Sequence, residues 1–287
     1  MQLIQYPHAT AFLRANQEWL AQNEALNSLL LGLTLDAEKK ETDENFYFSV
    51  NEEETIQLCG IQTPGRFLIL YTEDHLTNDT SSALADFLER EKPNLPGLLG
   101  PKTLVLDLAH FLKNTLDWDF EIVYKQLVYQ LQEVKYNPSS SGQMRTATPA
   151  DVPLVGAWMH KFVIEALNED DVEAARKTAK QKIKNGEVFL WYDKAVVTMC
   201  CVARPTRNGI SVNYVYTPVE YRKKGYGTKI VAEVSTLMLA RGYRFCTLFT
   251  DIENPTSNAI YQRIGYELVG EFRSVKFLQS AIAQGQQ

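Results

Sequence analysis

The residue types with the clearest chemical potential gather in residues 215–228, where two glycines and three basic residues follow a strand-like run. Gly225 and Gly227 stand at the start of an amphipathic helical pattern. Glycine lets the backbone approach a ligand closely and adopt positive φ, and free N–H groups at a helix start attract anions. This stretch therefore predicts a cradle for a phosphate or pyrophosphate. The basic residues that add positive charge to it are Arg222, Lys223 and Lys224.

Two other phosphate-binding loops are excluded by their own requirements. A P-loop needs GxxxxGK[ST], which does not occur in the sequence. A dinucleotide fingerprint needs a third glycine at the position where this chain has Ile230. Because a lone Gly-x-Gly at a helix start is a weak signal, a second motif is needed to support the cradle.

The second motif, DIENPTSNAIYQRIGY, covers residues 251–266 and follows another strand-like segment. RxxGxG at a helix start, followed by NPxSNxxYxxxGY, resembles the GNAT superfamily of N-acetyltransferases over residues 143–280. The forms YTPxEYRxKGYG and TDxxNPTSNxIYQRIGY are most similar to the branch that contains glycine N-acyltransferase-like proteins. Residues 1–142 carry neither motif.

The resemblance implies that acetyl-CoA is the co-substrate. It implies that the CoA pyrophosphate is held by the backbone N–H groups of Arg222, Lys223, Lys224, Gly225, Tyr226, Gly227 and Thr228. It also implies that the pantetheine arm pairs, like an added strand, with Val215, Tyr216 and Thr217. The remaining contacts to that arm are expected from Asn254, Ser257 and Asn258. Tyr261 is expected beside the sulfur.

The residues supply much of what acyl transfer to an amine requires. The reaction needs a donor for the oxyanion, a deprotonated amine and a proton for the leaving thiolate. The backbone N–H of Val215 is the candidate oxyanion donor, and Tyr261 is the candidate acid. A tyrosine, with a reference pKa of about 10, can protonate a departing thiolate at little cost.

Each of these residues also has a purely structural interpretation. Tyr261 could pack against Ile264 on a helix. Asn254 and Ser257 could serve as turn and N-cap residues, whether or not they touch CoA. The two lysines before Gly225 could form a solvated rim, and the histidine at position 160 more often makes a local hydrogen bond than it catalyses.

A general base is not evident. Some relatives place a glutamate on the strand before the glycine loop, but residues 210–216 read ISVNYVY and contain no carboxylate. Glu165 and the acidic run 169–171 lie where such folds usually build the acceptor site. Acidic residues in a first helical turn also complement the helix dipole. A water chain to one of these carboxylates, or an acceptor that arrives partly deprotonated, would serve equally well.

The elements that must position these residues follow from periodicity. Residues 143–287 predict helical patterns near 152–167 and 168–185, and strands at 187–192, 195–203 and 210–217. A helix at 225–241, a strand at 244–250, a short helix from 255 and a last strand near 266–277 complete the series. This order predicts a mixed α/β sheet rather than a doubly wound one.

The chain is long enough for two domains, and the turn-rich segment 138–142 is the predicted linker between 1–137 and 143–287. Residues 1–137 repeat the predicted order of elements of residues 143–287 less clearly, with a helical stretch at 10–35 and strands at 46–50, 55–61 and 66–72. After these strands, residues 73–79 are acidic and lack glycine. We therefore expect a tandem in which a GNAT-like first copy lost its ligand loop; the alternative is an unrelated α/β domain.

Composition limits the other function classes. The net charge of −6 divides into −11 for residues 1–142 (10 Lys/Arg, 21 Asp/Glu) and +5 for residues 143–287 (19 and 14), a weak signal for an anionic ligand. Four cysteines without a CxxC or His/Cys arrangement make a metal improbable. No signal peptide or long apolar run is present, so a cytoplasmic protein without membrane or nucleic-acid partners is expected.

The sequence thus predicts an acetyl-CoA-dependent N-acetyltransferase that moves acetyl directly to a primary amine, with a small-molecule acceptor favoured over a protein. The alternative is a CoA-binding or interaction module without catalysis. The acceptor, the acyl length, the oligomeric state and the role of the first domain stay open.

Overall fold

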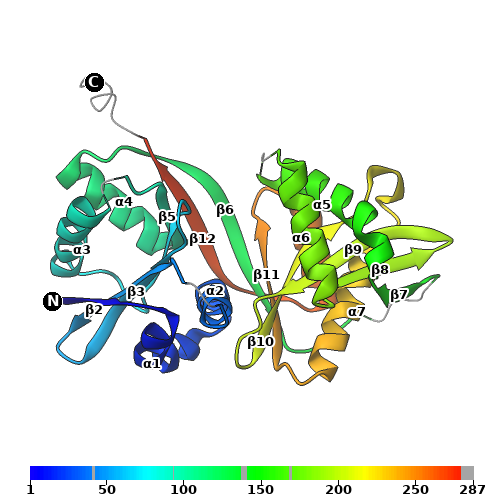
Figure 1. Ribbon diagram of the computed structural model, residues 1–287, viewed down its shortest axis with the longest axis horizontal. Helices are drawn as coiled ribbons and strands as arrows, with labels where there is room; N and C mark the ends of the chain where they lie inside the picture. Colours follow the sequence, from blue (N-terminus) through cyan, green and yellow to red (C-terminus); the bar gives the residue numbers. More distant parts are fainter. Residues whose placement is uncertain (41–42, 93, 137–140, 168–169, 279–287) are drawn as a thin grey trace. The chain divides into compact units, whose positions relative to one another are not determined.

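The computed structural model describes residues 1–40, 43–92, 94–136, 141–167 and 170–278 (Figure 1). These residues form two compact units. Unit 1 combines Met1–Val128 and Thr250–Glu253 with the chain from Val269 on, and unit 2 combines Tyr129–Phe249 with Asn254–Leu268. The greater part of the expected linker, residues 138–140, lies outside the described residues.

The two halves of the chain repeat one order of elements. The first half contains β1 (Gln2–Tyr6), α1 (Ala9–Leu20), η1 (Ala21–Asn23), α2 (Ser28–Glu38), β2 (Phe46–Glu52), β3 (Thr55–Gln62), β4 (Leu68–Tyr71), α3 (Asn78–Glu91), β5 (Gly97–Pro101), α4 (Lys102–Leu116) and β6 (Phe120–Leu131). The second half contains β7 (Gln143–Thr146), η2 (Pro149–Asp151), α5 (Val152–Leu167), α6 (Val172–Lys184), β8 (Val188–Asp193), β9 (Ala195–Ala203), β10 (Gly209–Tyr216), η3 (Val219–Tyr221), α7 (Tyr226–Ala240), β11 (Phe245–Asp251), α8 (Pro255–Ile264) and β12 (Glu267–Phe277).

Without the short 3₁₀ turns, both halves read β-α-α-β-β-β-α-β-α-β. In each half the first four strands pair antiparallel in chain order, and the fourth pairs in parallel with the fifth. A helix, α3 or α7, makes the crossover that a parallel pair requires. The predicted mixed α/β tandem is confirmed.

One predicted element was wrong in detail, because the helical stretch expected at 10–35 is two helices. The chain between α1 and α2 turns at 21–27, where Asn27 Nδ2 donates to the Leu20 carbonyl at 2.8 Å. An asparagine that bonds a nearby carbonyl offers the backbone an alternative to the helical ladder.

The last strand of the chain does not join the sheet of its own half. β12 pairs antiparallel with β5, from Phe272↔Pro101 to Lys276↔Gly97 (Figure 1). Apart from its first two residues, β12 belongs to unit 1. Gly97 permits this pairing, because a Cβ there would collide with the Val275 carbonyl. The first half contributes a strand end to unit 2 in the same way. The residues of β6 from Tyr129 on belong to unit 2, and β6 lies next to β11 in the sheet. The two compact units are therefore each built from segments that are separate in the sequence. The predicted linker at 138–142 divides the sequence into two halves but does not mark the boundary between these units.

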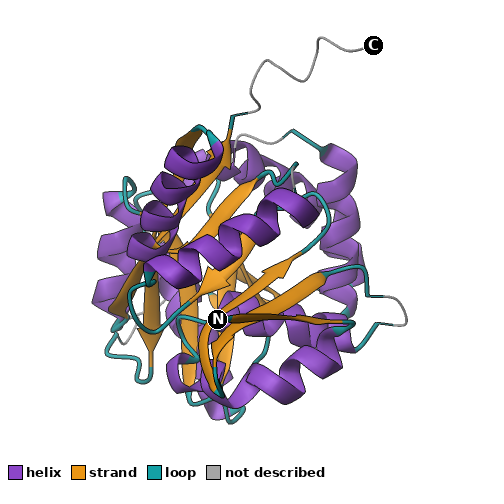
Figure 2. Cartoon of the chain, turned by 90° about the vertical axis from the view of Figure 1, so that its left-hand side faces the viewer, coloured by secondary structure: helices purple, strands orange, loops and turns teal. Residues whose placement is uncertain are grey.

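Helices cover both faces of the sheet in unit 1 (Figure 2). One apolar cluster lies under α3 and α4, and a second lies under α1 and α2. In unit 2, α5 and α6 pack on one face through residues that include Trp158, Met159, Ala179, Met199 and Cys201.

Candidate functional site

The strand that carries Val215 leaves its parallel neighbour partway along. β10 and β11 pair from Gly209↔Phe245 to Ser211↔Thr247, although β10 continues to Tyr216 and both strands are fully described. The pairing of β10 with β9 shifts register between Asn213 and Tyr216, and Tyr214 has φ +48°. A bulge of this kind bends a strand and ends its regular pairing. The second half of β10 therefore diverges from β11.

The turn after β10 is held by contacts with Thr198 of β9 and by a hydrogen bond within the turn itself. Thr198 Oγ1 lies 2.8 Å from both the Tyr216 carbonyl oxygen and Thr217 Oγ1. The N–H of Arg222 donates to the Val219 carbonyl at 3.2 Å, so this expected pyrophosphate donor is already engaged. Lys223 (φ +63°) and Gly225 (φ +77°) then turn the backbone through the left-handed region into α7.

The N-terminus of α7 is open in the way an anion site requires. Its N-cap is Gly225, no side chain caps it, and its first turn has no acidic residue. A Cβ built at Gly225 would meet nothing within 4 Å, and one at Gly227 would lie 3.7 Å from Thr217 Oγ1. The first N–H groups of a helix lack intrahelical partners, so this end can bind phosphate oxygens.

The corresponding helix of the first half, α3, is closed to an anion. Its N-cap Thr77 accepts from the Thr80 N–H at 3.2 Å, and Asp79 lies in its first turn. The strands before and after it stay close, because a Cβ at Gly100 would lie 2.5 Å from the Leu70 carbonyl oxygen. The crossover from β4 through α3 to β5 thus has neither the uncapped helix start nor the diverging strand that the crossover through α7 has.

The side chain of Arg222 links α5 to the end of β10. Its Nη2 lies 3.0 and 2.7 Å from the two carboxylate oxygens of Glu165, and its Nε donates to the Thr217 carbonyl at 2.9 Å. The guanidinium also lies 5.8 Å from the centre of the Tyr216 ring. The Glu165 carboxylate, a candidate base from the sequence, is therefore paired with a cation.

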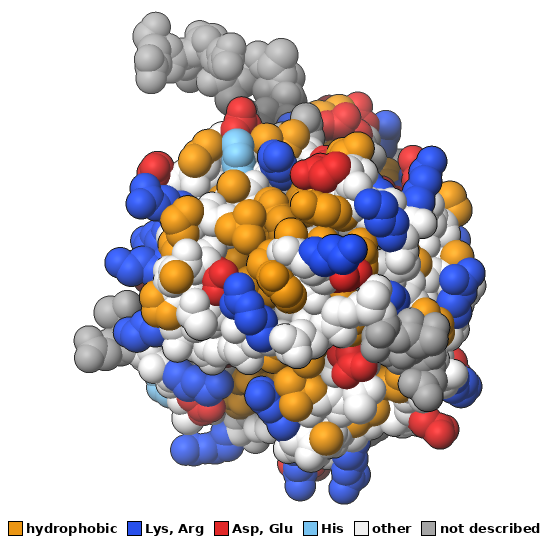
Figure 3. Space-filling model, turned by 90° about the vertical axis from the view of Figure 1, so that its right-hand side faces the viewer, with side chains coloured by type: hydrophobic (Ala, Val, Ile, Leu, Met, Phe, Trp, Pro, Cys, Tyr) orange, Lys and Arg blue, Asp and Glu red, His pale blue; other side chains and the backbone are white. Residues whose placement is uncertain are grey.

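Other basic and aromatic residues of the loop have local partners. Lys224 Nζ donates to the Glu220 carbonyl at 3.3 Å. The Tyr226 hydroxyl donates to Asp193 Oδ2 at 2.8 Å, which fastens the start of α7 to the turn between β8 and β9. This hydrogen bond, with one from Ser141, lowers the pKa of Asp193. Figure 3 shows that Lys and Arg side chains are dispersed over the β7 side of unit 2 rather than gathered in one strip.

The second motif forms the start of α8. Asn254 is its N-cap, and its Oδ1 accepts from the Ser257 N–H at 3.0 Å. Pro255 occupies the first helical position, and Gly265 ends the helix with φ +119°. The N-cap interpretation of Asn254 is confirmed, and its contact with CoA stays a prediction. Asn258 lies on the same first turn.

Tyr261 is buried on α8, with 8% of its surface exposed. Its ring centre lies 6.4 Å from that of Tyr129 and 5.9 Å from that of Tyr266. Burial, with a smaller contribution from Cys200, raises the pKa of the Tyr261 phenol well above its ordinary value. The group therefore keeps its proton, but it is a weaker acid than a free tyrosine, so proton transfer to a thiolate costs more than the ordinary phenol pKa implies.

The acidic residues near α6 have structural partners. His160 Nε2 lies 2.6 Å from Asp170 Oδ1, and Asp171 caps α6 by accepting from the Ala174 N–H at 2.8 Å. Both agree with the structural interpretations of these residues. Glu169 lies outside the described residues.

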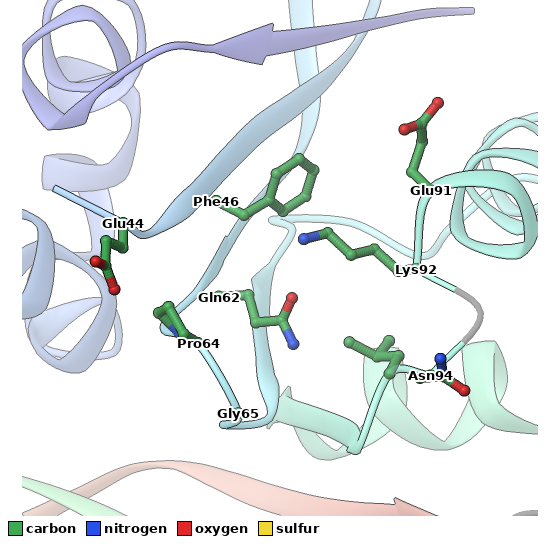
Figure 4. Close-up of a pocket in the computed structure, with 9 residues that line it drawn as sticks. Glu44, Phe46, Gln62, Pro64, Gly65, Glu91, Lys92 and Asn94 are labelled. Atoms are coloured by element: carbon green, nitrogen blue, oxygen red, sulfur yellow. The ribbon is translucent and has the colours of Figure 1, made fainter.

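A cavity of about 320 Å³ lies in unit 1, and none of the predicted site residues is among those that line it (Figure 4). Lys92 reaches across it toward Phe46, with Nζ 4.2 Å from the ring centre. Two glutamates, Glu44 and Glu91, are among the other lining residues. This mixed lining does not define one ligand chemistry.

Within the described ranges, no group of three or more His, Cys, Asp or Glu residues could hold a metal ion. All four cysteines are free and buried. Among the described helices, none is long and apolar enough to cross a membrane.

Residues 155–266 match the acetyltransferase (GNAT) family, so the chain contains a GNAT acetyltransferase domain at these positions. No curated protein sequence matches the chain significantly. Many solved structures share the fold. A Drosophila protein is 11% identical, with a TM-score of 0.67 and coverage of 96% of this chain and 98% of that chain.

Two further structures have descriptive names. A GCN5-related N-acetyltransferase from Sphaerobacter thermophilus is 15% identical over 96% of this chain and 95% of that chain, with a TM-score of 0.60. A tandem GNAT protein from the clavulanic acid biosynthesis pathway is 12% identical over 96% and 98%, with a TM-score of 0.56. At these identities the likeness shows the fold, including its tandem arrangement.

Proposed function

We propose that the GNAT domain at residues 155–266 is a cytoplasmic N-acetyltransferase that transfers acetyl from acetyl-CoA to a primary amine. The observation that carries this proposal is the uncapped start of α7 directly after a strand that diverges from its neighbour. Backbone N–H groups at the first feature suit a pyrophosphate, and exposed strand backbone at the second suits the amides of a pantetheine arm. The motif forms in both segments also support the glycine N-acyltransferase-like branch.

CoA would be held mainly by backbone. The N–H groups assigned to the pyrophosphate are those of Lys223, Lys224, Gly225, Tyr226, Gly227 and Thr228, since the N–H of Arg222 is engaged. The arm is assigned to Val215–Thr217 on one side and to the start of α8, with Ser257 and Asn258, on the other. Bound acetyl-CoA supplies an activated thioester.

The proposed reaction forms an N–C bond and breaks a C–S bond. The Val215 N–H stabilises the negative charge that develops on the carbonyl oxygen. Tyr261 gives its proton to the departing CoA thiolate, and the amine proton is lost to water, from which Tyr261 is reprotonated. Because Glu165 is paired with Arg222 and β10 has no carboxylate, the amine is expected to arrive neutral or to lose its proton through water.

A second candidate function is CoA binding without catalysis. The specific observation that favours it is the absence of a carboxylate from β10, from Gly209 to Tyr216. Turnover of any amine by the wild-type protein separates the two candidates. A small-molecule amine remains the proposed acceptor.

Gly227→Ala tests the cofactor site. The new Cβ would make only an ordinary contact with Thr217, and alanine is favoured over glycine in a helix by up to about 1 kcal/mol. We expect the variant to be as stable as wild type or more stable, yet to bind CoA at least tenfold more weakly in calorimetry, because the methyl group blocks approach of the pyrophosphate.

The matched control is Gly156→Ala on α5, where the Cβ would lie 3.4 Å from Arg176 Cα. It adds the same methyl group to a helix of unit 2 and should leave CoA affinity unchanged. CoA affinity within threefold of wild type in Gly227→Ala would overturn the assignment of the loop.

A further inference from the structure

Asn213 lies on β10 beyond the last residue that pairs with β11. Its Oδ1 is closed off from solvent and has no hydrogen-bond partner among the residues that the structure describes. A buried amide oxygen without a donor costs folding free energy, and an apolar side chain of the same shape would avoid that cost. Such a residue is expected where a bound molecule supplies the missing donor.

The strand register shows which face of the sheet Asn213 occupies. Asn213 pairs with Cys201 of β9, and directly opposed residues share a face. Cys201 packs with Trp158 and Ala179 of the α5–α6 layer. Asn213 therefore faces that layer.

Tyr261 lies on the other face. Ile210 lies three residues before Asn213 on β10 and therefore points to the opposite face, as does its partner Cys246 on β11. Cys246 Sγ donates to the Ser235 carbonyl of α7 at 4.0 Å. Ser235 Oγ lies 2.9 Å from the hydroxyl of Tyr266, whose ring centre is 5.9 Å from that of Tyr261. In the proposed reaction the leaving thiolate is thus protonated from the α8 face. The α5–α6 face is left for the amine, and Asn213 lies on it.

We propose that Asn213 Oδ1 accepts a hydrogen bond from an N–H of the acceptor amine, which rests on the proposed function. A primary amine has two N–H donors and one lone pair. With one N–H held by Asn213, the lone pair can be directed at the thioester carbon. An amide oxygen is too weak a base to remove the proton, so Asn213 binds and orients the amine.

The rings beside Asn213 indicate the class of amine. Tyr214 contacts Phe162 of α5 with ring centres 5.1 Å apart, and both side chains are partly exposed. Glu165 on the same helix is paired with Arg222 and does not offer a free carboxylate. Aromatic surface beside a carboxylate that is already paired with arginine suits a primary amine that carries an aromatic or apolar group, rather than a polycation.

Kinetics with benzylamine and spermidine as probe acceptors test the proposal. Thiol release from acetyl-CoA by the full-length wild-type protein should be faster, as kcat/KM, for benzylamine than for spermidine. Asn213→Ala and Asn213→Leu should raise the KM for benzylamine about 3–10-fold, the usual effect of one lost neutral hydrogen bond. Their CoA affinity should stay within twofold of wild type.

A second measurement does not depend on turnover. Asn213→Leu removes the buried oxygen but keeps the side-chain shape, so the unfolding temperature should rise by about 2–4 °C. Asn51→Leu on β2 is the matched control, because Asn51 Oδ1 already accepts from Ser49 Oγ at 2.8 Å. It makes the same change on a strand and should not stabilise the protein.

The outcomes are distinct. Higher stability together with a higher KM in Asn213→Leu supports the proposal. Higher stability with an unchanged KM would overturn it, since the oxygen would then need only an ordered water. Preference for spermidine would overturn the assigned class of amine. CoA binding without turnover of any amine would overturn the proposed enzyme and this role of Asn213, and would leave the cofactor site standing.

Discussion

Tyr261 is the residue on which catalysis depends most in the proposed reaction. Its ring is enclosed by Tyr129 and Tyr266, so removal of the hydroxyl alone leaves the packing of α8 in place. Tyr261→Phe is therefore expected to keep CoA affinity and stability while kcat and kcat/KM fall together by about 10²-fold, the lower end for general acid catalysis. The measurement is thiol release, with an acceptor found by an amine screen.

The pH dependence gives a second check on Tyr261. Because burial raises the pKa of its phenol, the proton is retained at and above pH 10, and Tyr261 should add no alkaline limb to the wild-type profile. The deficit of Tyr261→Phe should shrink as the pH approaches the thiol pKa of CoA, where the thiolate leaves without a proton. A Tyr261→Phe variant with the turnover of the wild type would contradict the role of Tyr261 as general acid and would leave it a packing residue only.

At the scale of elements, the Glu165–Arg222 pair joins α5, the end of β10 and the start of the glycine loop. Both side chains are more than a third exposed, at 49% and 41%, so the pair adds little to stability. Its position suggests that it matters for the geometry of the loop, because Arg222 loses one of its anchors when Glu165 is changed.

Glu165→Gln should therefore weaken CoA binding about 2–5-fold, the range expected for one exposed ion pair. Simple charge arithmetic predicts the opposite sign, since the variant removes a negative charge near an anion site. Calorimetry at two salt concentrations measures the effect, and Glu173→Gln in the first turn of α6 is the charge-matched control. Tighter CoA binding in Glu165→Gln would show that Glu165 competes with the phosphates for Arg222.

At the scale of the whole molecule, unit 1 depends on the last strand of the chain. β5 pairs with β12 from Gly97 to Pro101, and Val275 of β12 belongs to the apolar cluster under α3 and α4. A chain that ends at residue 268 should leave β5 without this partner and lose hydrogen-exchange protection in unit 1. A chain that ends at residue 278 keeps β12 whole and is the matched control. Equal protection in both would contradict the strand exchange.

The difference between the two helix starts also predicts the stoichiometry of the whole chain. Because Thr77 and Asp79 close the start of α3, while the start of α7 is uncapped, calorimetry on the full-length protein should give one CoA per chain. A value near two would require a ligand site in unit 1 and would contradict the expected loss of its loop.

Features set by neighbouring residues could be predicted from the sequence. The turn at Gly225, the N-cap at Asn254 and the order of strands and helices from residue 152 on depend on contacts within a few residues, because capping and left-handed φ are local properties. The strand β7 at Gln143–Thr146 was not predicted. The tandem could be inferred because each half repeats the same local patterns.

Features set by distant residues required the tertiary structure. A period-2 pattern does not say which strand a strand will pair with, so the exchange of β12 to β5 has no sequence signal. The same holds for the divergence of β10 from β11, for the engagement of Glu165 by Arg222, and for the unpartnered oxygen of Asn213. Each arises where segments far apart in the chain meet, and packing rather than local preference decides their geometry.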